Sequence, residues 1–270
     1  MSLRLSLHTK PEVPLEADVI CPDKLNGVNE AAIAALTVFH GNDQTALGDF
    51  FTVKGQCDGE IHLEGDLAHV KHLGSEMTTG KMIVEGDVGQ HLGACMSGGE
   101  IIVEGNAHDW VAPEMRGGRV TIKGNAGHLV GSGYRGSPIG MQGGEIIVHG
   151  SVRNETGHAM RGGLIAVGGN TGDFTGVNML AGTIIVLGEM GIRNGASMKR
   201  GTILSMHDAP MIPTFSYACT YNPTYLRLYL SYIRNLGLEV SDAQINGNYK
   251  RWIGDAIELN KGEILLYANQ

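Results

Sequence analysis

Short apolar runs and glycine-rich segments alternate along the chain, and this pattern returns at a nearly constant interval. The stretches SGGEIIVEGN, RGGRVTIKGN, QGGEIIVHGS and RGGLIAVGGN begin at residues 97, 116, 142 and 161. The glycine before each apolar run recurs after 21, 19, 19, 26, 19, 19 and 19 residues, at Gly59, Gly80, Gly99, Gly118, Gly144, Gly163, Gly182 and Gly201. A period near 19 residues predicts a solenoid, in which each repeat packs against its two neighbours.

Each apolar run has the length of a β-strand. Side chains alternate between the two faces of a strand, so the first and third of its three central residues point to the same side. These two columns are apolar in every repeat except at Ser205, and we expect them to form the core. The first column is Ile61, Met82, Ile101, Val120, Ile146, Ile165, Ile184 and Ile203, and the third is Leu63, Val84, Val103, Ile122, Val148, Val167, Val186 and Ser205.

The middle position of each strand is expected to face away from this core. Five of its eight residues are large aliphatic side chains, namely Ile83, Ile102, Ile147, Ile185 and Leu204, and the others are His62, Thr121 and Ala166. An outward apolar stripe predicts a buried interface, either with another subunit or with the chain's own terminal segments. The 26-residue interval adds seven residues near 132–138, and we expect Tyr134 and Arg135 of this loop to be further contact points.

Two more columns accompany the strands. A methionine stands three residues before most strand glycines, at Met77, Met96, Met115, Met141, Met160, Met179 and Met198, and another glycine stands three residues earlier, at Gly74, Gly93, Gly157, Gly176 and Gly195. An unbranched thioether that recurs in register is typical of a core filler. Glycine at this density suits tight corners and would destabilise helices, which excludes helical solenoids.

These patterns predict an all-β protein, a single-stranded right-handed parallel β-helix of about eight coils with a 19-residue repeat. We expect an N-terminal cap at residues 1–52, the β-helix at 53–208 and a partly helical C-terminal cap at 209–270. The caps would cover the open strand edges at both ends. Asn222 and Pro223 predict the N-cap and first residue of a helix near 223–236, and EILLYA predicts a final strand.

Composition narrows the classes of function. The formal net charge of −8 argues against nucleic-acid and anionic-membrane partners, which require a basic surface. The chain has no apolar leader and no long apolar run, which predicts a cytoplasmic location. Its four cysteines lack C-x-x-C spacing and are expected to be free thiols. The histidines His91, His108, His128 and His158 fall at different offsets in their coils and are not expected to stack on one another. His69 and His72 lack a third ligand in register, and no G-x-S-x-G segment is present, so we expect neither a metal site nor catalytic residues in this chain.

The G-x-x-G-x-x-x-G phrase resembles the C-terminal β-helix of glutamate synthase large subunits. A closer resemblance is to the C subunit of formylmethanofuran dehydrogenase and of the related bacterial formyltransferase/hydrolase complex. It is carried by PEVPLEAD at 11–18, LGDFFTVKG at 47–55, GSGYRGSPIGMQGGEIIVHG at 131–150 and GHAMRGG at 157–163, and it covers roughly residues 1–215. The segment NPTYLRLYLSYIRNLGL departs from the archaeal dehydrogenase subunits and favours the bacterial complex.

The resemblance implies a non-catalytic structural subunit of a complex that moves a formyl group between tetrahydromethanopterin and a methanofuran-type carrier (methylofuran) and produces formate. It implies no cofactor in this chain, with zinc, and in the dehydrogenase a tungsten or molybdenum pterin, in partner subunits. Because the carrier of this family has an anionic glutamyl tail, the corner residues Arg116, Arg161, Lys199, Arg200 and Arg135 are candidate contacts. The alternatives are a subunit of a tungsten or molybdenum dehydrogenase that reduces CO2, a freestanding β-helix domain of the glutamate synthase type, and a self-standing enzyme with a groove along the helix.

Overall fold

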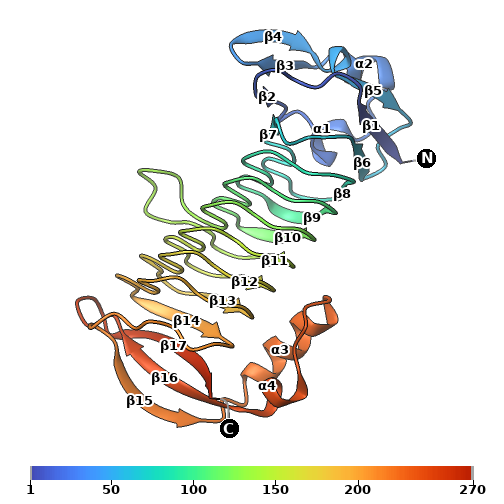
Figure 1. The fold of residues 1–270 in the computed structure, drawn as a ribbon. Coiled ribbons are helices and arrows are strands. Elements are labelled where there is room, and N and C mark those ends of the chain that lie inside the picture. Colours follow the sequence, from blue (N-terminus) through green and yellow to red (C-terminus); the bar gives the residue numbers. More distant parts are fainter. Residues whose placement is uncertain (1, 269–270) are drawn as a thin grey trace.

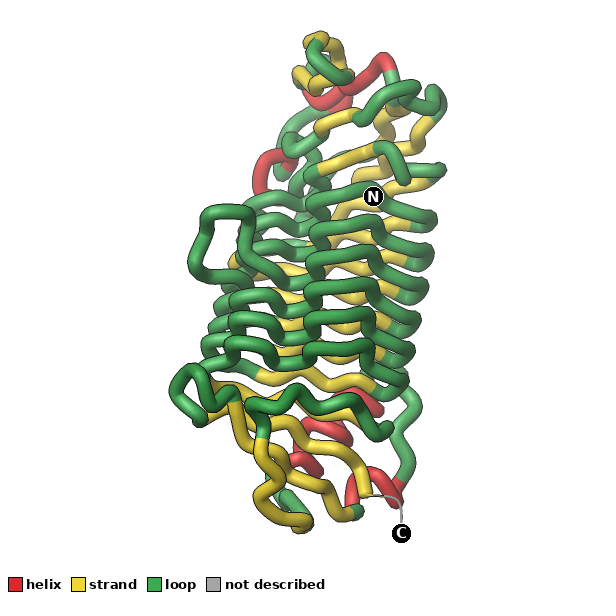
Figure 2. Tube along the Cα trace, turned by 60° about the vertical axis from the view of Figure 1, so that its left-hand side comes forward, coloured by secondary structure: helices red, strands yellow, loops and turns green. Residues whose placement is uncertain are grey.

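A computed structural model describes residues 2–268, and its central feature is a stack of parallel strands joined by glycine-rich corners (Figure 1). The strands are β6 (Glu60–Glu64), β8 (Lys81–Val84), β9 (Ser97–Val103), β10 (Gly117–Ile122), β11 (Glu145–Val148), β12 (Leu164–Val167), β13 (Thr183–Val186) and β14 (Arg200–Ser205). Each pairs in parallel with the strand of the next repeat. The chain therefore winds into the β-helix-like, elongated stack whose rungs Figure 2 shows from the side.

The register keeps equivalent residues of successive repeats side by side. Ile101 lies beside Val120, and Val120 lies beside Ile146, although the longest of the intervals separates the second pair. The seven additional residues leave the stack as the loop that projects to the left in Figure 1. The insertion thus changes the surface and leaves the sheet intact.

The core consists of the columns that the sequence predicts. Every residue of the first and third strand columns is 0% exposed, and so is each methionine of the column at 77, 96, 115, 141, 160, 179 and 198. The backbone at Gly182 has a φ of +103°, and a β-carbon there would lie 2.9 Å from the Cε of Met160. The left-handed backbone conformation favours glycine at this corner, and a β-carbon would also force the methionine to shift. The one polar member of the core columns, Ser205, bonds through its Oγ to the backbone of His207.

A ladder of polar side chains holds the corners after the strands. The Oδ1 of Asn106 accepts a hydrogen bond from the backbone N–H of Asn125 at 2.9 Å, and the Oδ1 of Asn125 accepts one from the N–H of Ser151 at 2.8 Å. The side-chain amide of Asn125 also donates to Asn106 at 3.3 Å. These bonds satisfy backbone groups that face away from the sheet ladder.

The N-terminal segment adds strands directly to the main sheet. Strand β1 (Leu3–Leu7) lies parallel to β6 and antiparallel to β5 (Phe51–Lys54). A second, smaller sheet contains β2 (Leu15–Glu16), β3 (Thr37–His40), β4 (Asp43–Ala46) and β7 (Val70–Lys71), and the helices here are α1 (Pro22–Leu25), α2 (Glu30–Ala34) and the 3-10 turn η1 (Leu47–Asp49). The main sheet therefore crosses the boundary expected at residue 52.

The C-terminal segment also continues the main sheet. Strand β17 (Lys261–Ala268) lies parallel to β14, and β16 (Asn248–Gly254) and β15 (Ser216–Tyr221) follow in antiparallel pairings. The helices are α3 (Leu226–Asn235) and α4 (Asp242–Asn246). Helix α3 begins three residues later than the N-cap pattern predicts, because the side chain of Asn222 donates to the carbonyls of Asn246 and Gly247 instead of capping a helix.

Candidate functional site

Helix α3 lies across the outer face of the lower coils (Figure 1). The outward residues Ile147, Ala166, Ile185 and Leu204 are 0% exposed, and they belong to one apolar cluster with Leu226, Leu230 and Ile233 of the helix. Part of the predicted outward stripe is therefore covered by the chain's own terminal segment. At Ile147, Ile185 and Leu204 the expectation of an interface with another subunit is corrected, since no free surface remains there.

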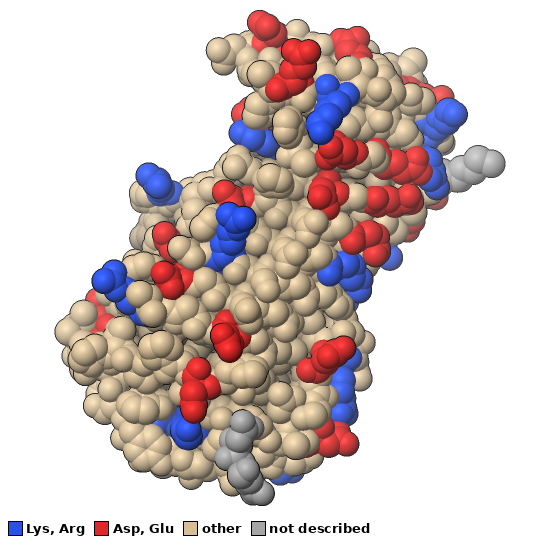
Figure 3. Space-filling view, in the orientation of Figure 1, with Lys and Arg blue, Asp and Glu red and all other residues tan. Residues whose placement is uncertain are grey.

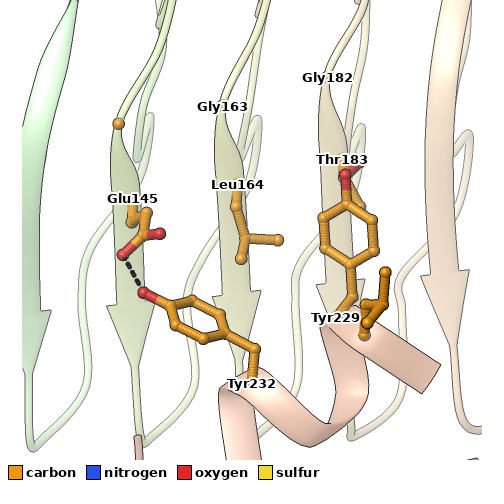
Figure 4. Close-up of a pocket in the computed structure, with 9 residues that line it drawn as sticks. Glu145, Gly163, Leu164, Gly182, Thr183, Tyr229 and Tyr232 are labelled. Carbon is orange, nitrogen blue, oxygen red and sulfur yellow. Dashed lines mark hydrogen bonds between the residues drawn. The ribbon is translucent and has the colours of Figure 1, made fainter. Parts of the chain in front are cut away.

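A groove of about 860 Å³ runs between α3 and the start of strands β11, β12 and β13 (Figure 4). Its walls include Leu164, Thr183, Tyr229 and the backbone of the strand glycines. At one end, the hydroxyl of Tyr232 donates to Glu145 at 2.7 Å. This arrangement offers a partly apolar channel and supplies no paired acid and base or activated nucleophile.

At the same end of the groove, Arg119, Glu145 and Tyr232 form a hydrogen-bonded cluster that contains one ion pair. Arg119 donates through Nε to Glu145 at 2.9 Å and through Nη2 to the hydroxyl of Tyr232 at 3.1 Å. Burial, followed by the hydrogen bond to Glu145, raises the pKa of Tyr232, and the bond to Glu145 raises the pKa of Arg119. The three side chains join α3 to strands β10 and β11, so their evident role is to hold the helix in place.

The upper half of the outer face is left open by α3. Ile83 and Ile102 are only partly buried there, between His62 and Thr121. Charged residues flank them, and Glu100 lies 3.6 Å from Lys81 and 3.5 Å from Arg119. Figure 3 shows acidic side chains gathered over the ends of β6, β8 and β9. This open face, centred on Ile83 and Ile102, combines apolar area with a charged rim, as protein interfaces do.

The insertion loop is anchored by a stack of rings. The rings of His72 and His91 are nearly parallel with centroids 4.6 Å apart, and those of Trp110 and Tyr134 have centroids 4.9 Å apart. His91 Nδ1 lies 3.0 Å from the hydroxyl of Tyr134. Burial raises the pKa of Tyr134 to about 12, and burial together with the charge of His72 lowers the pKa of His91 to about 4. Arg135 is exposed on the loop beyond this stack.

The stack of His72 on His91 was not predicted, because the expectation from the sequence compared only His91, His108, His128 and His158 with one another. Leu67 bridges Val88 across the longer first interval, whereas His72 stacks on His91 across an interval of the regular length. The two additional residues of the first repeat thus lie between Leu67 and His72. Offsets counted from the strand glycines conceal this pairing, and counting from Gly74 and Gly93 would have revealed it.

The predicted basic residues form a spaced row. Arg116, Arg161 and Lys199 each follow a methionine of the core column, at the same corner of every second coil, and all three are exposed. Two steps of a sheet separate neighbours by about 10 Å. Arg200 begins β14 beside Lys261 of β17, and Lys199 lies 4.0 Å from Glu258. The spacing suits contact with an extended anion along the surface, since all three side chains are exposed.

The described part of the chain was also compared with what a metal site, a reactive thiol or a membrane-spanning helix requires. No group of three or more His, Cys, Asp or Glu side chains within residues 2–268 is placed to hold a metal ion. Burial raises the pKa of the Cys21, Cys57 and Cys95 thiols, which keeps them protonated. None of the helices between residues 2 and 268 has the length and apolar character that a bilayer crossing requires.

Comparisons with known proteins relate this architecture to one group. No protein-family model matches the chain. It is 42% identical over 80 residues to the C subunit of "Molybdenum-containing formylmethanofuran dehydrogenase 1" of Methanothermobacter thermautotrophicus, which covers 29% of this chain and 20% of that protein. It is 44% identical over 89 residues to the C subunit of "Tungsten-containing formylmethanofuran dehydrogenase 2" of Methanothermobacter wolfeii, covering 31% and 33%. The matched segment thus spans between a fifth and a third of the length of these curated relatives.

A solved structure extends the likeness to the whole chain. A chain in the crystal structure of the formyltransferase/hydrolase complex of Methylorubrum extorquens, solved with methylofuran, has a TM-score of 0.91 and 30% sequence identity. The alignment covers 98% of this chain and 100% of that one. The chain belongs to the C-subunit family of these complexes. This coverage leaves out only 2% of the chain, so both end segments, with helix α3 and the antiparallel strands, belong largely to the shared fold.

Proposed function

We propose that the chain is a non-catalytic, cytoplasmic subunit of a formyltransferase/hydrolase complex. In this proposal the complex moves a formyl group between tetrahydromethanopterin and a methanofuran-type carrier such as methylofuran and produces formate. The full-length likeness to a chain of such a complex carries the proposal. The zinc of the hydrolytic centre, and any tungsten or molybdenum pterin, would belong to partner subunits.

The role proposed for this chain is that of a rigid scaffold, a right-handed β-helix of about eight coils with a 19-residue repeat. The in-register parallel pairing from β6 to β14 supports this arrangement. A stack whose core columns are fully buried presents fixed surfaces to its neighbours. Isolated chain should not turn over formyl substrates, and a purified chain that hydrolysed the formylated carrier unaided would contradict the proposal.

We place the main contact with a partner subunit on the open face at Ile83 and Ile102, with Tyr134 and Arg135 of the insertion loop as a second contact. The test is co-expression with the partner subunits and purification through a tag on a partner. Ile102→Arg should be lost from the purified complex, because burying an unpaired charge is costly. Ile192→Arg, at an apolar side chain 49% exposed elsewhere, is the matched control and should co-purify normally. Retention of Ile102→Arg would place the interface elsewhere.

A further proposed contact joins the basic row to the anionic glutamyl tail of the carrier. Arg116, Arg161, Lys199 and Arg200 would attract such a tail by charge without touching the reacting formyl group. In the assembled complex, Arg116→Glu with Arg161→Glu should raise KM for the carrier several-fold and leave kcat unchanged. The control pair Arg153→Glu and Arg193→Glu changes net charge equally at other positions of the coils. Equal effects of the two pairs would show a general charge effect and contradict this contact.

The alternative function is that of the C subunit of a molybdenum or tungsten formylmethanofuran dehydrogenase, which the segment identities of 42% and 44% to such subunits favour. Metal analysis of the natively purified complex distinguishes the two. Molybdenum or tungsten in stoichiometric amount would favour the dehydrogenase, and their absence together with formate release would favour the hydrolase.

A further inference from the structure

The groove between α3 and the strand starts continues beyond the hollow at Tyr232. A second hollow of about 560 Å³ adjoins the first, and Thr183 and Tyr229 line both. The lining positions 145, 164 and 183 are paired in register on successive strands, so the groove runs along the stack and crosses one coil after another. The two hollows therefore form an elongated channel, which suits a length of extended chain better than a compact ligand.

One wall of this channel is aromatic. Figure 4 shows Tyr229 and Tyr232 projecting from α3 toward the strand starts. Tyr229 is 37% exposed, and Leu228 beside it is 77% exposed, so this wall keeps apolar surface uncovered. Exposed apolar surface of this kind marks a place where another chain binds. Four tyrosines line the two hollows, namely Tyr221, Tyr225, Tyr229 and Tyr232.

The charged side chains of the channel neutralise one another. Glu145 lies 2.9 Å from the Nε of Arg119, and Glu263 lies 2.7 Å from the Nε of Arg251. Among the described residues, the lining of the two hollows contains no further charged side chain. A charged occupant would have to compete with these pairs, whereas a neutral occupant leaves them intact. The channel therefore favours an uncharged ligand.

The floor of the channel offers hydrogen-bond donors. Gly144, Gly163 and Gly182 lie there, one from each coil, and all three are half-buried. Their carbonyls already accept bonds from N–H groups of the next coil, at 3.0 to 3.1 Å. Their own N–H groups donate to no residue between 2 and 268. An occupant that presents carbonyl oxygens and few N–H groups would match this floor.

We propose that this channel binds a proline-rich segment of another protein in the polyproline II conformation. The inference goes beyond the proposed function and does not depend on it. Proline has no N–H, so such a segment brings carbonyl acceptors and requires no acceptor from the channel. Grooves lined by aromatic side chains are the surfaces on which proline-rich segments dock.

The repeat of the stack matches the repeat of this ligand. Polyproline II has three residues per turn and a rise of about 3.1 Å, so the same side of the chain returns after about 9.3 Å. Two steps of the sheet span about 9.6 Å. Gly144 and Gly182 are two coils apart. Carbonyls of successive turns can therefore meet the N–H groups of both glycines.

The site is tested on the isolated full-length chain by NMR of its tyrosine rings. The probes are three octapeptides with blocked ends, made of proline, of alternating glycine and serine, and of alternating valine and serine. The proline peptide should saturate with a Kd on the order of 0.1–1 mM. The glycine-serine peptide should bind at least about tenfold more weakly, because it is neither apolar nor preorganised. Absent or equal binding would overturn the proposal, and tighter binding of the valine-serine peptide would overturn it in favour of a β-strand ligand.

Matched variants place the binding in the channel. Tyr229→Ala should weaken binding of the proline peptide by about tenfold, because it removes a ring from the wall. Tyr217→Ala is the control, since this tyrosine is 53% exposed on β15 and does not line the channel, and it should bind the peptide normally. Tyr229→Leu keeps apolar bulk on α3 and should show the same loss, which separates the ring from the packing of the helix. Full binding by either variant of Tyr229 would overturn the site. Assembly with the partner subunits tests the proposed function separately.

Discussion

The methyl carbon of Met160 lies 2.9 Å from the point that a β-carbon on Gly182 would occupy, so the methionine of one coil fills the space left free by the glycine of the next. The same relationship joins Met141 to Gly163 at 2.6 Å. The methionine and glycine columns therefore depend on each other. Without the methionine the corner would hold a cavity, and without the glycine the methionine would clash with a β-carbon.

Replacing Gly182 by alanine should destabilise the stack. The new β-carbon would meet Met160 in a closely packed core, and alanine would adopt an unfavourable φ of +103°. Overpacking and backbone strain together predict a loss of about 2–4 kcal/mol in the free energy of unfolding. Urea denaturation measures it. Gly136→Ala is the control, because its φ is +90° with no atom within 4 Å, and it should cost about 1 kcal/mol. Equal losses would mean that packing against methionine contributes nothing.

Helix α3 should depend on its buried face. Leu230 is 0% exposed above Ile185 and its neighbours, so Leu230→Ala should cost about 2–5 kcal/mol and loosen the cover over the lower coils. Hydrogen exchange in α3 and binding of an apolar dye report the loosening. Leu228→Ala, at a side chain 77% exposed, should change neither quantity. Unchanged exchange in the Leu230 variant would contradict the covering role of the helix.

The corner ladder predicts a local effect. Asn106→Ala removes the acceptor for the N–H of Asn125 and should destabilise the chain by about 1 kcal/mol. The exchange of that one amide should accelerate more than that of amides two coils away. Asn106→Ser retains an acceptor oxygen, as Ser151 does at the equivalent corner, and places no second carboxylate beside Asp87, so it should protect the amide better than alanine does. Equal acceleration in both variants would argue against the ladder.

The ring stack predicts a pH dependence. Burial and the nearby charge of His72 hold the pKa of His91 at about 4, below its ordinary value of 6.5. A lowered pKa in the folded state contributes stability that is complete above pH 6.5 and is lost as the pH falls through about 4. Free energies of unfolding measured from pH 7 to 4 should therefore fall less steeply in His91→Phe. His108→Phe, at an exposed histidine, is the control. An NMR titration midpoint of His91 near 6.5 would contradict the prediction.

The sequence is informative wherever one coil repeats the next. The core columns and the methionine column follow from period and side-chain alternation alone, because the same contacts recur in successive repeats. The sequence predicts that Ile185 is buried, either by another subunit or by a terminal segment of the chain. It does not decide between the two, since α3 lies outside the repeats, beyond the last coil.

The ring stack beside the insertion loop could not be predicted from the sequence for a related reason. His72 and Tyr134 share no repeat position, and the two residues inserted before His72 hide its alignment with His91. The start of α3 was misplaced because Asn222 bonds to a distant turn. Contacts between non-equivalent parts of the chain carry no periodic pattern that could reveal them.

The strict pairing of β8 to β14 with strands one repeat away makes the molecule modular in length. Removing residues 164–182 would join β11 to β13 with matching partners on both sides and leave the two antiparallel ends unchanged. The span between those ends would shorten by about 4.8 Å, one sheet step, and twist would turn one end relative to the other. A lineage that gains or loses whole units therefore adjusts the reach and angle of its scaffold in fixed increments, while the strand pairing at either end is kept.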